Sequence, residues 1–305
     1  MTEGPTTEPL VNLAEIAEIE LFIVKRMKEL TLGDHAGVFK GPGFDFVGVR
    51  DWEPGDRTSS IDWAQSSLTN FSPMITRECE QPSNATIIAV ADASLSTRCG
   101  AAGTPIAAAI ARSVAAVGLS AVFCQDLFGL MTFDGNFRQI AAVRPRIGKS
   151  HVVHCLDVYQ ECAAADGSGQ QGDFTATIAA HLRRTSLVPV ISDFLFADAE
   201  RVIAELSLLN AVHDVFLIMV DARFAYRVPD VSAGWIDIFD VETGRTRTLS
   251  RRELHRLVIR IEEWQEDIQQ RARDSDLDIV RVGLDRWEME TALVSFVAER
   301  RLRKL

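Results

Sequence analysis

The sequence has few cysteines, and their spacing excludes a disulfide framework. Its 305 residues include five cysteines, an odd number, and no two of them form a Cys-x-x-Cys pair. Paired cysteines are typical of small secreted domains, whereas cytosolic thiols stay reduced. Residues 1–9 also lack the basic start and apolar middle of a signal peptide. We therefore expect a cytoplasmic protein.

Excess basic charge and long apolar runs are also missing. The chain has 32 Lys and Arg against 43 Asp and Glu, which gives a formal net charge of −11. A general nucleic-acid binder needs a basic stripe to displace counterions, so we expect no nucleic-acid partner. We find no stretch that approaches the roughly 18–20 apolar residues of a membrane span, so we expect no stable membrane insertion.

From about residue 85 onward, short apolar segments alternate with helical patterns. The segments at 86–92, 187–193 and 215–220 are mainly apolar runs, as expected for strands that are covered on both faces, and a last strand is expected at 277–282. Helical patterns lie between them, at 106–119, 149–163, 174–184, 197–209, 251–268 and 287–302. Hairpins are expected at 126–143 and 235–249. This alternation predicts an α/β fold with a doubly wound, mostly parallel sheet.

The first 84 residues follow a different pattern. Residues 1–8 are polar, apolar residues recur at helical spacing over 13–30, and residues 41–81 form short extended pieces broken by turns such as Pro54-Gly55-Asp56. We therefore predict a disordered tail at 1–8, an N-terminal helix with a β-rich appendage at 9–84, and an α/β domain with a C-terminal helical extension at 85–305.

The apolar run at 86–92 ends abruptly in Asp92, followed by Ser94 and Ser96. Open α/β sheets bind their ligands at the carboxyl ends of the strands. Three oxygens at alternate positions can face one hard cation, and oxygen ligands suit Mg²⁺, Mn²⁺ or Ca²⁺. A second strand ends in Asp193, which adds another carboxylate. If the hydroxyls bind the ion directly, the two carboxylates orient bound water, and a partner's carboxylate fills the open position.

Two other functions start from the same residues. Phosphotransferases of the haloacid-dehalogenase class place a nucleophilic Asp after their first strand, which makes a magnesium-dependent phosphohydrolase using Asp92 the alternative. Those enzymes place a second Asp two residues later as the general acid, and this chain has Ser94 there. A third reading is an interaction protein with an inactive metal site. We favour a non-enzymatic protein and assign no catalytic residue.

Short motifs between residues 43 and 80 precede these candidate metal ligands. They comprise Arg50, Gly55, Asp56, Ile61, Asp62, Trp63, Arg77, Glu78 and Glu80. Together with the Asp-Ala-Ser-Leu-Ser stretch at 92–96 and the Ile-Ser-Asp-Phe stretch at 191–194, they resemble the bacterial domain-of-unknown-function family fifty-eight. The resemblance runs from about residue 40 to the C-terminus, and the segment from Gly55 to Trp63 is its most specific part.

This resemblance implies a von Willebrand factor A-like fold with a metal-ion-dependent adhesion site. It also implies partnership with a MoxR-type AAA+ ATPase in the assembly, activation or metal insertion of a client complex. The third loop of such a site normally supplies a threonine, and here either Asp173 or Thr175 takes that position. We therefore expect a cytoplasmic adaptor that binds an acidic client residue through Mg²⁺ (or Mn²⁺ or Ca²⁺).

Overall fold

The computed structural model divides the chain into two compact units. One unit is Leu30–Asn84, and the larger unit contains the residues before Leu30 and those from Ala85 on. The structure describes residues 9–32, 45–53, 61–80, 85–98, 100–101, 104–162, 172–196, 198–226, 235–240, 245–283 and 289–296. The tail predicted at 1–8 and the motif residues Gly55 and Asp56 lie outside these ranges.

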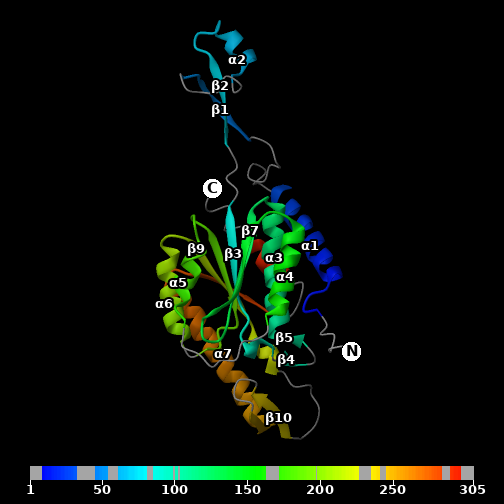
Figure 1. Cartoon of the computed structure of the whole chain (residues 1–305). Coiled ribbons are helices and arrows are strands. Elements are labelled where there is room, and N and C mark those ends of the chain that lie inside the picture. Colours follow the sequence, from blue (N-terminus) through cyan, green and yellow to red (C-terminus); the bar gives the residue numbers. More distant parts are fainter. Residues whose placement is uncertain are drawn as a thin grey trace, which may run out of the picture. The chain divides into compact units, whose positions relative to one another are not determined.

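The larger unit is built around a six-stranded sheet in the order β12-β9-β8-β3-β6-β7 (Figure 1). Its strands are β3 (Thr86–Asp92), β6 (Leu127–Phe133), β7 (Gln139–Arg146), β8 (Leu187–Ser192), β9 (Asp214–Val220) and β12 (Asp278–Val282). All neighbouring pairs are parallel except β6 and β7. The doubly wound, mostly parallel sheet predicted from the sequence is therefore confirmed. Its strand order reverses between β3 and β8, which is where open α/β sheets bind ligands.

Helices cover both faces of this sheet (Figure 1). Helices α3 (Ile106–Phe123) and α4 (Lys149–Glu161) pack on one face, and α5 (Phe174–Ala179), α6 (Ala199–Asn210) and α7 (Arg251–Asp274) pack on the other. A large apolar cluster joins α5, α6 and the second half of α7 to the sheet. Helix α5 ends five residues earlier than the 174–184 pattern predicted, and residues 289–296 are helical, within the last predicted helix.

Helix α3 is the most apolar helix among the described residues. By length and composition its 18 residues are sufficient to cross a membrane, and 83% of that stretch is buried inside the unit. This corrects our expectation that no apolar stretch approaches the length of a membrane span. The sequence pattern predicts a helix that ends at Leu119, whereas α3 continues to Phe123. Its alanines permit close packing on the sheet, and at Gly118 an added Cβ would lie only 2.8 Å from Val152.

The N-terminal helix α1 (Leu13–Leu32) packs on α3 and α4. Its apolar residues Ile16, Ile19 and Ile23 are buried, Glu15 pairs with Arg112 of α3 at 3.1 Å, and Glu20 pairs with Lys149 of α4. We predicted that this helix and the β-rich appendage together form one region of the chain, residues 9–84. The structure instead groups the helix up to Glu29 with the α/β unit, because its apolar stripe is buried there.

The smaller unit contains the antiparallel strands β1 (Asp45–Asp51) and β2 (Ile75–Glu80) and the short helix α2 (Trp63–Leu68). The Ile-Asp-Trp motif begins this helix. Ile61 is buried beside Thr76, and one carboxylate oxygen of Asp62 accepts hydrogen bonds from the backbone N–H groups of residues 64 and 65, as an N-cap does. The first two motif residues therefore build the unit, whereas Trp63 is exposed. Arg50, Arg77, Glu78 and Glu80 lie on the two strands.

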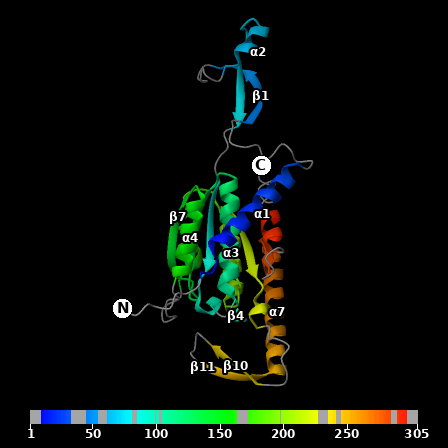
Figure 2. The same cartoon turned by 90° about the vertical axis from the view of Figure 1, so that its right-hand side faces the viewer.

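A hairpin of β10 (Trp235–Asp240) and β11 (Arg245–Ser250) leads into α7. Ser250 and Glu253 form a capping box at the start of this helix. Figure 2 shows that the first half of α7 and the hairpin extend beyond the carboxyl ends of the parallel strands, while the second half of α7 packs along the sheet. The remaining short elements are η2 (Leu95–Arg98), β4 (Gly100–Ala101), β5 (Thr104–Pro105) and η3 (Ala222–Tyr226).

Candidate functional site

Asp92 lies at the point where the strand order of the sheet reverses. Its Oδ2 accepts a 2.6 Å hydrogen bond from the Ser192 hydroxyl at the end of β8, and its Oδ1 accepts a 2.9 Å bond from the backbone N–H of Ser94. The hydroxyl of the buried Tyr159 donates to the Asp92 carbonyl at 2.8 Å. The side chain and the backbone of Asp92 are thus held from two strands and from α4.

A second buried carboxylate, Asp134, lies next to Asp92 and was missed by the sequence analysis. Burial raises the pKa of Asp92, hydrogen bonds from Ser192 and Ser94 oppose this shift, and the charge of Asp134 raises the pKa further. Asp134 follows β6, and it accepts hydrogen bonds from the backbone N–H groups of Asn136 and Arg138 at 2.9 Å each. The Arg138 side chain also pairs with it at 2.7 Å. Two carboxyl groups, one of them paired with Arg138, therefore lie close together and away from water at this edge of the sheet.

The hydroxyls of Ser94 and Ser96 converge beside these carboxylates. Their Oγ atoms are 3.1 Å apart. The turn that carries them is fixed by Thr97, whose hydroxyl donates to the Ser94 carbonyl at 2.7 Å, and by Arg98, whose guanidinium donates to the Cys162 carbonyl at the end of α4. The two hydroxyls share a hydrogen bond and the fold holds their turn in place, while their role as ligands of a cation stays a prediction.

The loop before α5 reaches the site through the turn that follows β6. The N–H of Gly172 donates to the Asn136 carbonyl at 2.8 Å, and a Cβ at Gly172 would lie 2.7 Å from the carbonyl oxygen of Phe137, so only glycine permits this approach. The same turn lies beside Ser94, since a Cβ added at Gly135 would lie 3.8 Å from the Cβ of Ser94. This is the loop for which the sequence predicts Asp173 or Thr175 as a site residue.

Asp173 and Thr175 interact with each other at the start of α5. Asp173 is the N-cap, and its Oδ1 accepts from the backbone N–H of Ala176 at 3.0 Å and from the Thr175 hydroxyl at 3.3 Å. Asp173 therefore caps α5, and Thr175 donates to Asp173. The choice between them as the residue that completes the site stays a prediction.

Asp193 lies in the turn after β8 and is 3% exposed. Its Oδ1 accepts a hydrogen bond from the N–H of Leu195 at 3.1 Å. Two side chains of α7 hold the backbone of this turn: Gln265 donates to the Asp193 carbonyl and Trp264 to the Phe194 carbonyl, each at 2.9 Å. The Asp193 carboxylate therefore lies on a turn whose backbone is held in place by helix α7.

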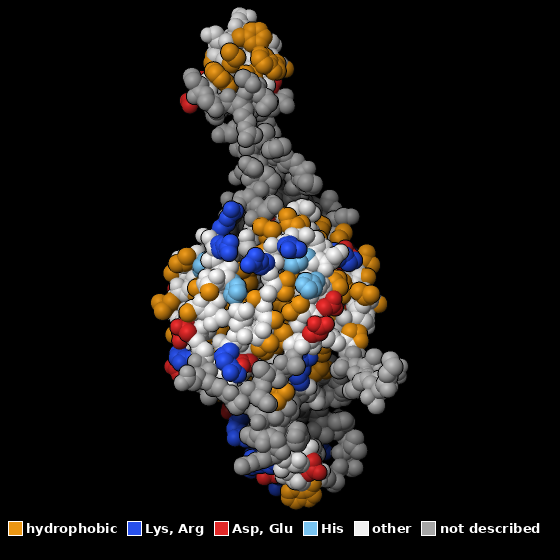
Figure 3. Space-filling view, viewed as in Figure 1, with side chains coloured by type: hydrophobic (Ala, Val, Ile, Leu, Met, Phe, Trp, Pro, Cys, Tyr) orange, Lys and Arg blue, Asp and Glu red, His pale blue; other side chains and the backbone are white. Residues whose placement is uncertain are grey.

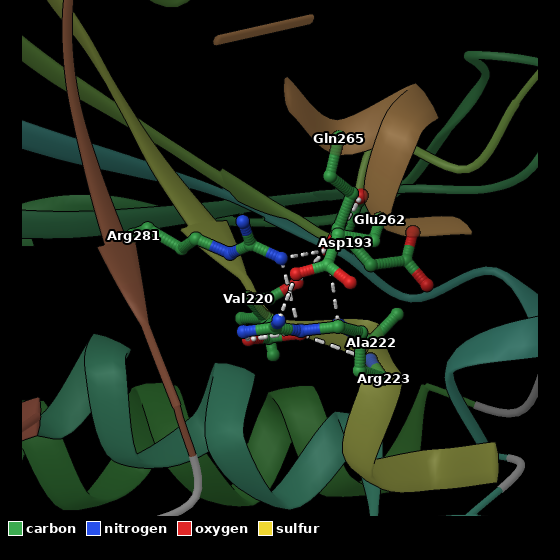
Figure 4. Close-up of polar contacts among 8 residues, drawn as sticks. Asp193, Val220, Ala222, Arg223, Glu262, Gln265 and Arg281 are labelled. Atoms are coloured by element: carbon green, nitrogen blue, oxygen red, sulfur yellow. Dashed lines mark hydrogen bonds and ion pairs between the residues drawn. The ribbon is translucent and has the colours of Figure 1, made fainter. Parts of the chain in front are cut away.

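Gln265 is fully buried and uses its whole amide (Figure 4). Its Nε2 also donates to the Val220 carbonyl at 2.9 Å, while its Oε1 accepts from the N–H of Ala222 at 3.4 Å and from the guanidinium of Arg281 at 3.1 Å. A glutamine amide has two donor hydrogens and two acceptor lone pairs, so all four are used. One side chain of α7 therefore joins the carboxyl ends of β8 and β9 to β12.

An ion cluster lies beside this glutamine, near the end of β9 and on β12 (Figure 4). Asp221 pairs with Arg223 at 2.6 Å and with Arg281 at 3.3 Å, and Arg223 also pairs with Glu262 of α7. Burial alone would raise the pKa of Asp221, but the hydrogen bonds from Arg223 and the charge of Arg281 outweigh burial and lower it. The cluster has two positive and two negative side chains.

The donor atoms at the site suit a hard cation that rests on hydroxyl oxygens. Ser94 and Ser96 offer two neutral oxygens, Asp92 and Asp134 supply negative charge close by, and no sulfur or imidazole is among these side chains, a composition that fits Mg²⁺ rather than zinc. The described residues contain no group of three or more His, Cys, Asp or Glu that could hold a metal ion. An ion at this site would therefore depend on the two serines.

Fold and site together define an α/β protein with a polar site at the switch point of a doubly wound sheet. Residues 48–271 match the family described as "Protein of unknown function DUF58". The match spans most of the chain, and the chain belongs to this family. It begins within β1 and extends through most of α7, so it includes both the smaller unit and the site.

Relatives in mycobacteria are similar over most of their length. The chain is 26% identical over 256 residues to "Uncharacterized protein Mb1516" of Mycobacterium bovis and to "Uncharacterized protein Rv1480" of Mycobacterium tuberculosis, with 82% of this chain and 77% of each relative covered. Two solved structures are also similar at 14% identity. One is an aerotolerance-related membrane protein from Bacteroides fragilis, with a TM-score of 0.42 and coverage of 73% of this chain and 100% of that one. The other is BatB from Bacteroides thetaiotaomicron, with a TM-score of 0.41 and coverage of 71% and 98%.

Proposed function

We propose that this chain is a non-enzymatic adaptor of the von Willebrand factor A type, which binds an acidic residue of a partner protein through a divalent cation. The observation that carries the proposal is the pair of hydroxyls of Ser94 and Ser96, 3.1 Å apart, beside the buried carboxyl of Asp92. These residues lie at the reversal of strand order, where a ligand of this class of fold binds. The antiparallel edge strand β7 agrees with the proposed type.

The residues of the site have separate roles in this proposal. Ser94 and Ser96 hold the cation directly, and Asp92 and Asp193 provide negative charge behind them. Ser192 and Tyr159 orient Asp92, and Gln265 orients the turn of Asp193. When bound, Mg²⁺ (or Mn²⁺ or Ca²⁺) supplies a positive centre with an open position for a carboxylate oxygen. The partner then recognises the chain through one acidic side chain and the surface around it.

The proposed partners are a MoxR-type AAA+ ATPase and an acidic client protein in the cytoplasm. This part rests on the resemblance of the motifs at 50–80 and 92–96 to those of the family. In this role the chain serves the assembly, activation or metal insertion of a client complex. Co-purification with a MoxR-type ATPase, in Mg²⁺ and in chelator, tests it with the wild type and Ser94→Ala; the proposal expects capture that both chelation and the substitution reduce.

The alternative, a magnesium-dependent phosphohydrolase, would use Asp92 as a nucleophile. Both oxygens of this carboxylate accept hydrogen bonds, and the residue is only 2% exposed. A nucleophile must reach its substrate in a near-attack geometry, which this environment disfavours. Turnover of a generic phosphate ester that is abolished in Asp92→Asn would establish the enzyme instead of the adaptor.

A calorimetric titration with Mg²⁺ and with Mn²⁺ tests the metal site itself. We expect one ion per wild-type chain and binding at least about tenfold weaker in Ser94→Ala, because one of the two direct ligands is removed. The matched control is Ser67→Ala in α2, an exposed serine whose hydroxyl donates to the carbonyl of Ala64 within the same helix. No binding by the wild type, or equal binding by Ser94→Ala, would overturn the metal site.

A further inference from the structure

The hairpin and the first half of α7 carry a stripe of exposed arginines. We call residues 235–240 and 245–260 the basic arm. Figures 1 and 2 show that the arm extends beyond the sheet edge at which Asp92 and Asp193 lie. Within the helical part, 251–260, there are four arginines and one glutamate, a net charge of +3 in a chain whose net charge is −11. The arm is therefore of opposite sign to the chain as a whole.

The arginines of the arm are placed where they do not stabilise the helix. Arg252, Arg256 and Arg260 follow one another at four-residue spacing, so like charges are neighbours on the helix surface, which disfavours the helix. They lie opposite the buried residues Leu254 and Ile261. The first of them is also near the helix N-terminus, where the macrodipole disfavours cations.

None of these three arginines forms an ion pair with a residue that the structure describes. Elsewhere on the same helix, Arg271 pairs with Asp267 and Glu200. Arg256 has a favourable electrostatic interaction with Glu253, one turn earlier, but the row of neighbouring like charges is a departure from local stability rules of the kind expected at functional surfaces. The stripe is therefore better explained by something that binds it than by the fold.

Exposed apolar side chains accompany the stripe. Trp235, at the start of the hairpin, is 75% exposed, and Ile259, between the arginines, is 40% exposed. Arginine with tryptophan is the combination enriched at the centres of protein interfaces. Guanidinium groups also bind carboxylates through two parallel hydrogen bonds. An acidic protein surface fits this composition better than a nucleic acid, because it offers apolar groups to Trp235 and Ile259 as well as carboxylates to the arginines.

The arm is continuous with the candidate site. Arg260 precedes Gln265 by five residues, roughly 7.5 Å along the helix axis. Gln265 and its neighbour Trp264 hold the turn that carries Asp193. A partner whose carboxylate binds at the site thus has the basic arm within reach, and an acidic surface around that carboxylate would be attracted to it.

We propose that the basic arm is the docking surface for an acidic protein, and that this is the partner whose carboxylate binds at Ser94 and Ser96. The second half of this statement rests on the proposed function. The arm supplies electrostatic attraction that is sensitive to salt, and the site supplies the metal-dependent contact. The two contributions are therefore separable by experiment.

The experiment is a titration of the full chain with fluorescein-labelled poly-L-glutamate, in Mg²⁺ and in chelator. The arm variant is Arg252→Gln, Arg256→Gln and Arg260→Gln. The control variant, Arg144→Gln, Arg146→Gln and Arg183→Gln, removes the same charge from exposed arginines at the other end of the sheet, on the body of the larger unit. Figure 3 shows Lys and Arg side chains (blue) both on that body and on the part that projects below it.

We expect the arm variant to bind at least about tenfold more weakly in both buffers, and the control variant to stay within about twofold of the wild type. Affinity of the wild type should fall steeply with added salt. Ser94→Ala should lose only the increment that Mg²⁺ adds. If Ser94→Ala shows no such loss while the arm variant still weakens, the metal site fails and the arm stands. Equal losses in the arm and control variants, or none in the arm variant, would overturn the arm.

Two further measurements decide the class of partner. Duplex DNA and vesicles with anionic headgroups are titrated in the same way, and tighter arm-dependent binding to either than to poly-L-glutamate overturns an acidic protein as the occupant. Thermal unfolding of the arm variant should occur at the wild-type temperature or above it, because repulsion between like charges is removed. A lower unfolding temperature would mean that the arginines are structural, and would overturn the proposal.

Discussion

The hydroxyl of Ser192 donates a 2.6 Å hydrogen bond to the buried carboxylate of Asp92, 100 residues earlier in the chain. The same hydroxyl accepts a hydrogen bond from the N–H of Phe194 at 2.9 Å. It therefore connects the end of β3 to the turn that carries Asp193. The two carboxylates that the sequence suggested for one site are joined through this serine.

Replacing Ser192 by alanine should destabilise the chain by about 1–3 kcal/mol, because Asp92 loses a hydrogen bond and stays buried. Denaturant unfolding at neutral pH measures this loss. Ser67→Ala, at an exposed serine, is the matched control and should change stability by less than about 0.5 kcal/mol. Equal stability of Ser192→Ala and wild type would show that the bond contributes nothing.

Asp92 should make the metal-free chain less stable as pH rises. Its pKa is raised by burial, so the unfolded chain ionises first, and the stability contributed by the protonated form is lost as pH rises from the ordinary value of about 3.9 through the raised value. Asp92→Asn should therefore be more stable than wild type at neutral pH in chelator, with a flatter dependence on pH. Denaturant unfolding at pH 4 and pH 7 tests this, with Asp237→Asn as the control. A neutral-pH loss in Asp92→Asn contradicts it.

Asp221 should have the opposite pH dependence. The pKa of this carboxyl is lowered because Arg223 and Arg281 outweigh its burial, so its contribution is present above the ordinary value of about 3.9 and is lost as pH falls through the lowered one. We expect Asp221→Asn to cost about 1–3 kcal/mol at neutral pH and much less in acid. Urea unfolding at the two pH values measures the difference. A cost that does not change with pH would rule out the charge as its cause.

Gln265→Leu should both destabilise the chain and weaken metal binding. Four hydrogen bonds of a buried amide are lost, and the backbone groups of Asp193, Val220 and Ala222 lose this partner, which should cost about 2–4 kcal/mol. Because Trp264 is then the one side chain of α7 that still donates to the turn of Asp193, we expect Mg²⁺ affinity to fall by about tenfold or more. Calorimetry on folded protein separates the two effects.

The control for this variant is Gln269→Leu, one turn later on α7, where the side chain is only partly buried. It should change neither stability nor metal affinity to a comparable degree. A Gln265→Leu variant that loses stability and keeps full Mg²⁺ affinity would restrict this residue to a structural role.

Some features of the fold and the site depended on local pattern alone. Continuous apolar runs of β-branched residues identified β3, β8 and β9 because strands covered on both faces need them, and they also placed Asp92 and Ser192 at strand ends. The capping box of Ser250 and Glu253 is also a local feature, because its two residues lie three positions apart in the chain. When strands and helices alternate along a chain, the rules for connections leave only a few possible sheet topologies, so the doubly wound sheet could be predicted.

Other features were decided only by the tertiary structure. Asp134 gives no motif, and its importance comes from lying beside Asp92 in space. Gln265 is 72 residues from Asp193 in the chain, and nothing in an amphipathic helix pattern distinguishes a glutamine that faces the core. Local sequence therefore determined which oxygen-bearing side chains lie at the ends of the strands. Contacts between distant segments decided which side chains hold those oxygens in place, because such contacts depend on how the layers pack and leave no periodic trace in the chain.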